Sequence, residues 1–285
     1  MIISKKIVKA IVRWTLPEGF CDVVRRVHKK REILDRKARQ TLASNHQLKD
    51  VHNGERCFIL ATGPSINKQN LKLLRGEKCI AVSNFFLHPD YNIIKPYYYC
   101  VAQCHSPVTE EAWQAWISEM ADRTIDAAMF FSLKDQPSIL LNGNFMNRKV
   151  FYLKFGESWD GAFVGDIDIT RPLPLPQSVT LIALVVALYL GFRNIHLLGC
   201  DHDGFLHVYE SRHFYDENKD VLVKKGYNEW YQRDLGEQFR AAYNLWLQYK
   251  VIRAYAQKNG INIYNATEGG YLDVFPRVDF SSLFE

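Results

Sequence analysis

Short apolar runs alternate with longer polar or amphipathic stretches from about residue 55 to the end of the chain. Seven of these runs have the length and composition of buried strands, and strands that alternate with helices in this way are typical of a mostly parallel sheet covered on both faces. The predicted strands are Cys57–Ala61, Cys79–Ser83, Tyr97–Ala102, Ala128–Ser132, Val150–Phe155, Asn194–Leu198 and Ile261–Tyr264. The pattern predicts a single Rossmann-like α/β domain over residues 46–285.

One longer segment is apolar nearly all round, as in a buried helix. Ser178 is placed to cap its start, and Gly191 is placed to end it. The strand that follows, ending near Leu198, leads directly into Asp201. The polar and aromatic stretch beyond it, residues 202–235, is long enough to form a lid over the strand ends.

The first 45 residues have a different character and are predicted to form a separate basic, amphipathic helical segment. Residues 1–40 contain twelve Lys and Arg against four Asp and Glu, a net charge of +8, so the rest of the protein carries −3 of the total +5. Such a helix over residues 1–17 suits an anionic membrane surface, although it is also compatible with a solvated helix packed on the main domain. Nucleic acid is not an expected partner, because no nucleic-acid-binding module is recognisable.

The amino-acid composition narrows the class of protein further. Apolar residues make up 47% and charged residues 24% of the chain, which is a globular composition. No run reaches the roughly 20 apolar residues of a membrane-spanning helix. The six cysteines lie mostly in apolar runs without zinc-ligand spacing and are interpreted as reduced core residues. These features predict a cytoplasmic protein that can associate with the inner face of the cytoplasmic membrane.

Candidate binding residues follow the predicted strands, because ligands of open α/β sheets bind beyond the carboxyl ends of the strands. The first strand leads into a turn whose backbone N–H groups suit a phosphate, with a glycine for close approach and a proline and serine to start a helix. The residues of this turn are Thr62, Gly63, Pro64 and Ser65. An ordinary capped helix start is the alternative interpretation.

Amides follow the next two strands, namely Asn84 and Gln103. An amide both donates and accepts hydrogen bonds, so it can recognise a base or a ribose, although either residue alone could be a turn residue. In the long loop, His213 is the candidate general base, since imidazole titrates near neutral pH. Arg212 and Tyr215 accompany it and support a catalytic loop.

Five segments occur in an order that resembles known enzymes. They are Thr62-Gly-Pro-Ser65, Ser83-Asn-Phe-Phe86, Gln177-Ser178, Leu190-Gly-Phe-Arg-Asn-Ile-His-Leu-Leu-Gly-Cys-Asp201 and Ile263-Tyr-Asn-Ala-Thr-Glu-Gly-Gly270. The first four resemble the bacterial sialyltransferases of glycosyltransferase family 42, and the last is more similar to the related 6-hydroxymethylpterin diphosphokinase-like superfamily. The resemblance covers about residues 55–280 and implies a GT-A-variant-like fold.

The resemblance implies roles for individual residues. Thr62, Gly63 and Ser65 would line the nucleotide phosphate and ribose, with Thr62 in place of the family's usual asparagine. Asn84 and, as the nearest counterpart of a third-strand asparagine, Gln103 would contact the donor. Ser178 matches the serine that contacts the donor carboxylate, and His213 matches the proposed base. Tyr209 or Tyr215 would match the tyrosines that assist the departing phosphate.

The implied reaction is an inverting displacement at the anomeric carbon, in which His213 takes the acceptor proton as CMP leaves. Tyrosine hydroxyls and the turn at Gly63 could stabilise the single phosphate without a metal or cofactor. The expected donor is a CMP-activated acid sugar, namely sialic acid, another nonulosonic acid or Kdo. The expected acceptor is a glycan or glycolipid of surface polysaccharide or lipopolysaccharide biosynthesis.

Three alternatives stay open at this point. Asp201 and Asp203 form an Asp-x-Asp pattern that could hold a divalent ion on a UDP- or GDP-sugar. The ending at 265–270 also fits an ATP- and Mg²⁺-dependent pterin diphosphokinase. A nucleotide-binding scaffold subunit without catalysis would keep the turn at Gly63 and make no use of the histidine in the loop. The sequence does not specify an oligomeric state.

Overall fold

The computed structural model describes residues 34–156, 166–207, 212–227 and 234–285. One compact unit extends from Arg36 to Glu285, and the residues before it belong to a separate unit. The unit begins earlier than the residue 46 expected from the sequence. Leu42 is fully buried in it, and Asn45 donates from Nδ2 to the carbonyls of Tyr152 and Ile169, at 2.9 Å each. The amphipathic helix predicted for residues 1–17 lies outside the described residues, and its membrane association stays a prediction.

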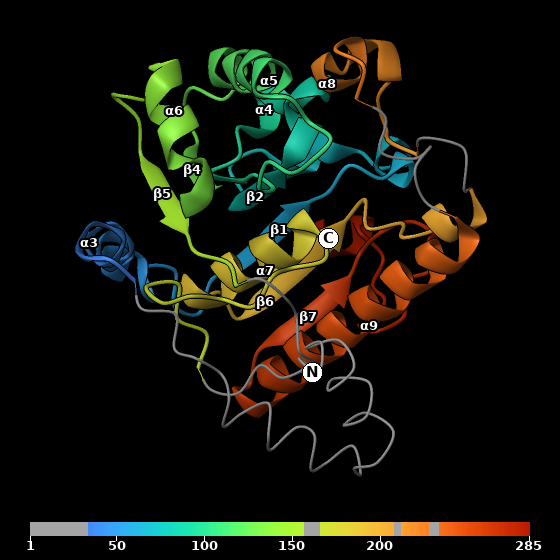
Figure 1. Ribbon diagram of the computed structural model, residues 1–285. Helices are drawn as coiled ribbons and strands as arrows, with labels where there is room; N and C mark the ends of the chain where they lie inside the picture. Colours follow the sequence, from blue (N-terminus) through green and yellow to red (C-terminus); the bar gives the residue numbers. More distant parts are fainter. Residues whose placement is uncertain (1–33, 157–165, 208–211, 228–233) are drawn as a thin grey trace, which may run out of the picture. The chain divides into compact units, whose positions relative to one another are not determined.

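A single sheet of seven parallel strands forms the centre of this unit, in the order β5-β4-β3-β2-β1-β6-β7 (Figure 1). The strands are β1 (Arg56–Leu60), β2 (Cys79–Val82), β3 (Tyr98–Cys100), β4 (Ala128–Ser132), β5 (Val150–Leu153), β6 (Asn194–Leu198) and β7 (Asn262–Asn265). All seven predicted strands are confirmed, because strands buried on both faces leave continuous apolar runs in the sequence. The α/β fold class predicted from those runs is confirmed with them.

Helices cover both faces of the sheet and give it two apolar cores. On one face pack α7 (Val179–Tyr189) and α9 (Leu235–Lys258). On the other face pack α4 (Tyr91–Ile94), α5 (Glu110–Arg123) and α6 (Gln136–Asn142). The remaining described α-helices are α3 (Arg36–Ala43) and α8 (Val221–Lys224). Short 3₁₀ turns occupy several connections, including η2 (Pro64–Lys68), η4 (Ser83–Leu87), η6 (Gly204–Leu206) and η7 (Glu217–Lys219).

The strand order reverses between β1 and β6. From β1 the chain adds strands outward to β5, then returns through α7 and adds β6 and β7 on the other side of β1. In open parallel sheets this reversal opens a crevice at the carboxyl ends of the two strands. The fold therefore directs a ligand site to the residues that follow β1 and β6.

The buried helix predicted after Ser178 is α7, and every residue from Thr180 to Tyr189 is buried between the sheet and its neighbours. Ser178 is the N-cap residue, as predicted, although its side chain makes no capping hydrogen bond. Gly191 follows the helix with a positive φ of 91°, as a helix-ending glycine does.

The cysteine prediction holds for four of the five described cysteines, which are free and buried. Cys104 is different, because it is only partly buried. Cys21 lies outside the described residues. None of the helices in the described ranges has the length and apolarity required to span a membrane.

Candidate active site

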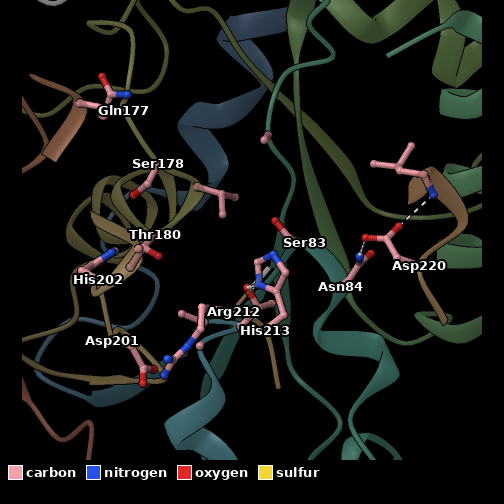
Figure 2. Close-up of a pocket in the computed structure, with 18 of the residues that line it drawn as sticks. Ser83, Asn84, Gln177, Ser178, Thr180, Asp201, His202, Arg212, His213 and Asp220 are labelled. Carbon is pink, nitrogen blue, oxygen red and sulfur yellow. Dashed lines mark hydrogen bonds between the residues drawn. The ribbon is translucent and has the colours of Figure 1, made fainter. Parts of the chain in front are cut away.

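A cavity of about 450 Å³ opens at the carboxyl ends of the central strands. It is lined by the residues that follow β1, β2, β3 and β6, by the start of α7, by α9 and by the loop after β6. The structure brings nine of the predicted site residues to this cavity, and Figure 2 shows several of them facing one another. They are Thr62, Gly63, Asn84, Gln103, Ser178, Asp201, Arg212, His213 and Tyr215.

Three predicted residues are not in this group. Ser65 is buried, with an exposed fraction of 4%, and neither it nor Pro64 is among the residues that line the cavity. Pro64 begins the short 3₁₀ helix η2 rather than an α-helix. Tyr209 lies outside the described residues.

The turn after β1 is held by Asp201 at the end of β6. Ser65 donates from its backbone nitrogen and from Oγ to the Asp201 carboxylate, at 3.2 and 2.7 Å. The backbone N–H of Gly63 donates to the carbonyl of Gly199 at 2.9 Å. The expected phosphate contacts by the N–H groups of Gly63 and Ser65 are therefore corrected, because both groups already have protein acceptors.

Gly63 is required at this turn for space. Its φ is −65°, which any residue can adopt, but a Cβ there would lie 1.9 Å from Asp201 Oδ2 and 2.5 Å from the carbonyl oxygen of Gly199. Burial raises the pKa of Asp201, and the hydrogen bonds from Ser65 oppose that rise. Asp201 thus supports the floor of the cavity by fixing the turn.

The second carboxylate of the Asp-x-Asp pattern has its own partner. Arg212 lies with its guanidinium 3.0 Å from Asp203 Oδ2, and the same guanidinium is 2.6 Å from Nε2 of His207. Within the described ranges no group of three or more His, Cys, Asp or Glu side chains could hold a metal ion. Asp201 fixes the turn and Asp203 orients Arg212.

Asn84 lines the cavity, yet both ends of its amide are engaged. Ser83 before it has a left-handed φ of 47°, which turns the chain sharply at the end of β2. Nδ2 of Asn84 donates to Asp220 at 2.7 Å and to the Tyr215 hydroxyl at 2.9 Å, and Oδ1 accepts the indole N–H of Trp116. The predicted donor contact by Asn84 therefore competes with contacts inside the protein.

Gln103 lines the cavity beyond the end of β3. Its Oε1 accepts a hydrogen bond from Ser132 at 3.0 Å. The carboxamide is thereby oriented by the neighbouring strand β4, where Ser132 is the last residue.

The loop after β6 brings His213 over the turn. Nδ1 of His213 lies 3.2 Å from Thr62 Oγ1, and the backbone N–H of Phe214 donates to the Thr62 carbonyl at 2.9 Å. The imidazole stacks on the ring of Tyr215, with centroids 5.0 Å apart and planes 7° from parallel. In Figure 2 the imidazole lies between Ser178 on one side and Asn84 on the other.

His202 and Tyr249 were missed by the sequence reasoning. His202 lines the cavity and has a left-handed φ of 48°. Its Nε2 lies 2.7 Å from the hydroxyl of Tyr249, a fully buried residue of α9. Burial lowers the pKa of His202 to about 4. No sequence pattern singles out His202, which stands between the two carboxylates of the Asp-x-Asp pattern, and Tyr249 lies 47 positions further along the chain.

We expect His202→Asn to remove an acid sensitivity of the fold, because asparagine tolerates the left-handed backbone and does not titrate. Free histidine has a pKa of about 6.5, so between about pH 4 and 6.5 the unfolded chain binds a proton that the folded chain does not. The free energy of unfolding then falls as pH drops through this window.

Urea denaturation of both proteins across that range measures the effect. The stability of the wild type relative to the variant should decrease by about 3 kcal/mol between neutral pH and about pH 4. A difference that does not change with pH would show that His202 titrates normally.

The last predicted motif, residues 263–270, and the residue after it pack against the end of β6 behind the cavity. Thr267 Oγ1 accepts the backbone N–H of Cys200 at 3.0 Å, and the N–H of Tyr271 donates to the Asp201 carbonyl at 2.8 Å. A Cβ on Gly270 would lie 2.8 Å from the Asp201 backbone. None of residues 265–270 lines the cavity, so the motif that resembles a pterin diphosphokinase serves the packing of the β6 end.

The fold and the cavity together define a doubly wound α/β protein with a candidate ligand site at the strand-order reversal. No family model matches the chain, and no curated protein matches it. Among solved structures, the chain is similar to that of the sialyltransferase CstII from Campylobacter jejuni in complex with a substrate analogue, CMP-3FNeuAc. The two share 11% identity with a TM-score of 0.47, over 79% of this chain and 86% of that chain. We therefore draw the function from the residues of the cavity.

Proposed function

We propose that the protein is a glycosyltransferase that moves an acid sugar from a CMP-activated donor onto a surface-glycan acceptor. The observation that carries the proposal is that the turn at Gly63, the start of α7 and His213 converge on one cavity of about 450 Å³. A cavity of this size is within the usual range for small-molecule substrates.

The start of α7 is the proposed position for the negatively charged part of the donor. The first N–H groups of a helix favour an anion, and the residues at the start of α7, Ser178, Val179 and Thr180, line the cavity. Oγ of Ser178 is buried beside the Tyr249 hydroxyl. A carboxylate or phosphate oxygen of the donor would accept a hydrogen bond from this serine.

His213 is the proposed general base. In the reaction, the acceptor oxygen forms a bond to the anomeric carbon while the bond from that carbon to the CMP phosphate oxygen breaks. The acceptor hydroxyl proton passes to the imidazole, and the electron pair of the broken bond leaves with CMP. Thr62 and Tyr215 orient the imidazole through Nδ1 and the ring face, as a general base requires.

The leaving phosphate would be stabilised by Arg212 and by the Tyr215 hydroxyl, both of which line the cavity. Asp203 holds the guanidinium, and Asn84 holds the hydroxyl. Preorganised donors of this kind can stabilise a single departing phosphate. The proposal therefore includes no divalent ion and no cofactor, and it gives Asp201 and Asp203 positioning roles.

Thermal-shift measurements with CMP, UDP, GDP and ATP, each with Mg²⁺ or with EDTA, test the proposed donor. A ligand at about 100 times its Kd stabilises the fold by about 2.7 kcal/mol, which is a readily measured rise in Tm. We expect CMP to raise Tm equally in Mg²⁺ and EDTA. A rise only with UDP or GDP in Mg²⁺ would point to the metal-dependent alternative, and a rise only with ATP and Mg²⁺ would point to diphosphoryl transfer.

A further inference from the structure

Asp220 is a lid-loop residue whose carboxylate points into the protein. It is the N-cap of α8, and its Oδ1 accepts the backbone N–H of Leu222 at 2.8 Å. An N-cap aspartate commonly leaves its other oxygen in water, whereas Asp220 has an exposed fraction of only 8%. Its Oδ2 accepts from Asn84 at 2.7 Å and lies 3.5 Å from the Tyr215 hydroxyl (Figure 2).

The orientation of the Asn84 amide determines which side chain at position 220 can form all of the observed hydrogen bonds. The indole nitrogen of Trp116 can only donate a hydrogen bond, so it fixes Oδ1 of Asn84 toward α5 and leaves Nδ2 toward the loop. A side chain that meets Nδ2 and also caps α8 must accept twice. A carboxylate does so with its two oxygens, whereas an amide can accept with one end only.

The same contacts reach the proposed base. Tyr215 connects Asn84 to the loop through its hydroxyl and stacks with its ring on His213. Burial raises the pKa of the Asp220 carboxyl, and the hydrogen bond from the Leu222 N–H and the Coulombic interaction with His213 oppose that rise. Asp220 thus lies close enough to His213 for an electrostatic interaction between the two side chains.

We propose that Asp220 is a positioning residue, which fastens the loop to the end of β2 through Asn84 and thereby holds Tyr215 and His213 over the turn at Gly63. Asn84 then serves the loop rather than the donor. The effect on catalysis rests on the proposed function, but the fastening of the loop does not.

A reciprocal exchange of the two side chains is the test. Asp220→Asn loses one acceptor, and Asn84→Asp places two carboxylates against each other. In the double variant N84D/D220N, the carboxylate at 84 accepts from Trp116 and from the new amide, whose oxygen still caps α8. The bonds from Trp116, between residues 84 and 220 and to the Leu222 N–H are all restored in the double variant alone. The Tyr215 hydroxyl, which accepts from Asn84 in the wild type, can then donate to the carboxylate at 84.

Asp216→Asn is the matched control. Asp216 is also an N-cap in this loop, since it accepts the N–H of Asn218 at 2.9 Å, but its side chain is exposed. The same chemical change at residue 216 should leave both the hydrogen exchange of the loop and the rate of turnover at wild-type values.

The first readout is hydrogen exchange of the Phe214 amide, which donates to Thr62 when the loop is in place. We expect faster exchange of this amide in each single variant and wild-type exchange in the double variant. Unchanged exchange in Asp220→Asn, or no rescue by the double variant, would overturn the proposal whatever the reaction proves to be.

The second readout is turnover of CMP-sialic acid, followed as CMP release. A displacement of catalytic groups by about 1 Å can lower kcat by about 10²-fold, so we expect a fall of about 10- to 100-fold in kcat for each single variant, with little change in KM. The double variant should recover most of the loss. If KM alone changes, Asn84 and Asp220 contact the donor and the positioning role is wrong.

If no donor is turned over while the exchange pattern holds, the fastening of the loop stands and the proposed transferase activity fails. The two proposals are thereby judged separately.

Discussion

Replacement of His213 by alanine is expected to lower the rate of CMP release from a CMP-sugar by about 10²- to 10⁴-fold, the usual contribution of a general base. The affinity for CMP should stay near the wild-type value, because CMP binding does not require a proton transfer. The expected loss of rate has a geometric reason, since Thr62 and Tyr215 hold the imidazole at the cavity, where it can take up the acceptor proton.

His213→Gln separates the proton transfer from the position of the loop. Glutamine fills much of the space of the imidazole with a polar amide but has no basic nitrogen near neutral pH. Both variants should therefore have low activity, with CMP affinities measured by calorimetry close to that of the wild type. A glutamine variant with nearly full activity would exclude His213 as the base, and a loss of CMP binding in both would make it a binding residue.

A substitution at Gly63 should have the largest effect on the fold of the site. A Cβ at this position would lie 1.9 Å from Asp201 Oδ2, closer than any real contact, and 2.5 Å from the carbonyl oxygen of Gly199. Asp201 cannot simply rotate away, because Ser65 holds both of its oxygens. Overpacking of a rigid site usually costs about 1–3 kcal/mol and occasionally more.

For Gly63→Ala we therefore expect a decrease of about 3 kcal/mol in the free energy of unfolding and a loss of CMP binding. Urea denaturation and calorimetry measure the two effects. Gly156→Ala is the matched control, because a Cβ there meets only the Leu173 carbonyl oxygen at 3.6 Å, an ordinary contact. Wild-type stability and CMP affinity in Gly63→Ala would show that the turn can move and does not shape the site.

Much of the fold could be predicted because its cause is local in the sequence. The central strands of this sheet are buried on both faces, so they appear as continuous apolar runs, and α7 is apolar all round for the same reason. The rule that ligands bind at the carboxyl ends of strands then placed Thr62, Asn84 and Asp201 at one cavity.

The partners of those side chains could not be predicted, because they come from distant parts of the chain. Ser65 and Asp201 are 136 positions apart, and so are Asn84 and Asp220. The N–H groups of the turn were expected to face a phosphate. Because β6 lies beside β1, the N–H of Gly63 instead donates to the carbonyl of Gly199, the residue that follows β6. Which side chains meet across the cavity depends on the path of the loop after β6.

The measurement that tests the central claim most directly is CMP release from CMP-sialic acid and related CMP-sugars by the purified wild-type protein in EDTA, with the sugar product followed by mass spectrometry. We predict release of CMP at a rate unaffected by EDTA, together with transfer of the sugar to an acceptor or to water. No release from any CMP-sugar, while a UDP-sugar, a GDP-sugar or ATP is consumed only with Mg²⁺, would contradict the proposed activity.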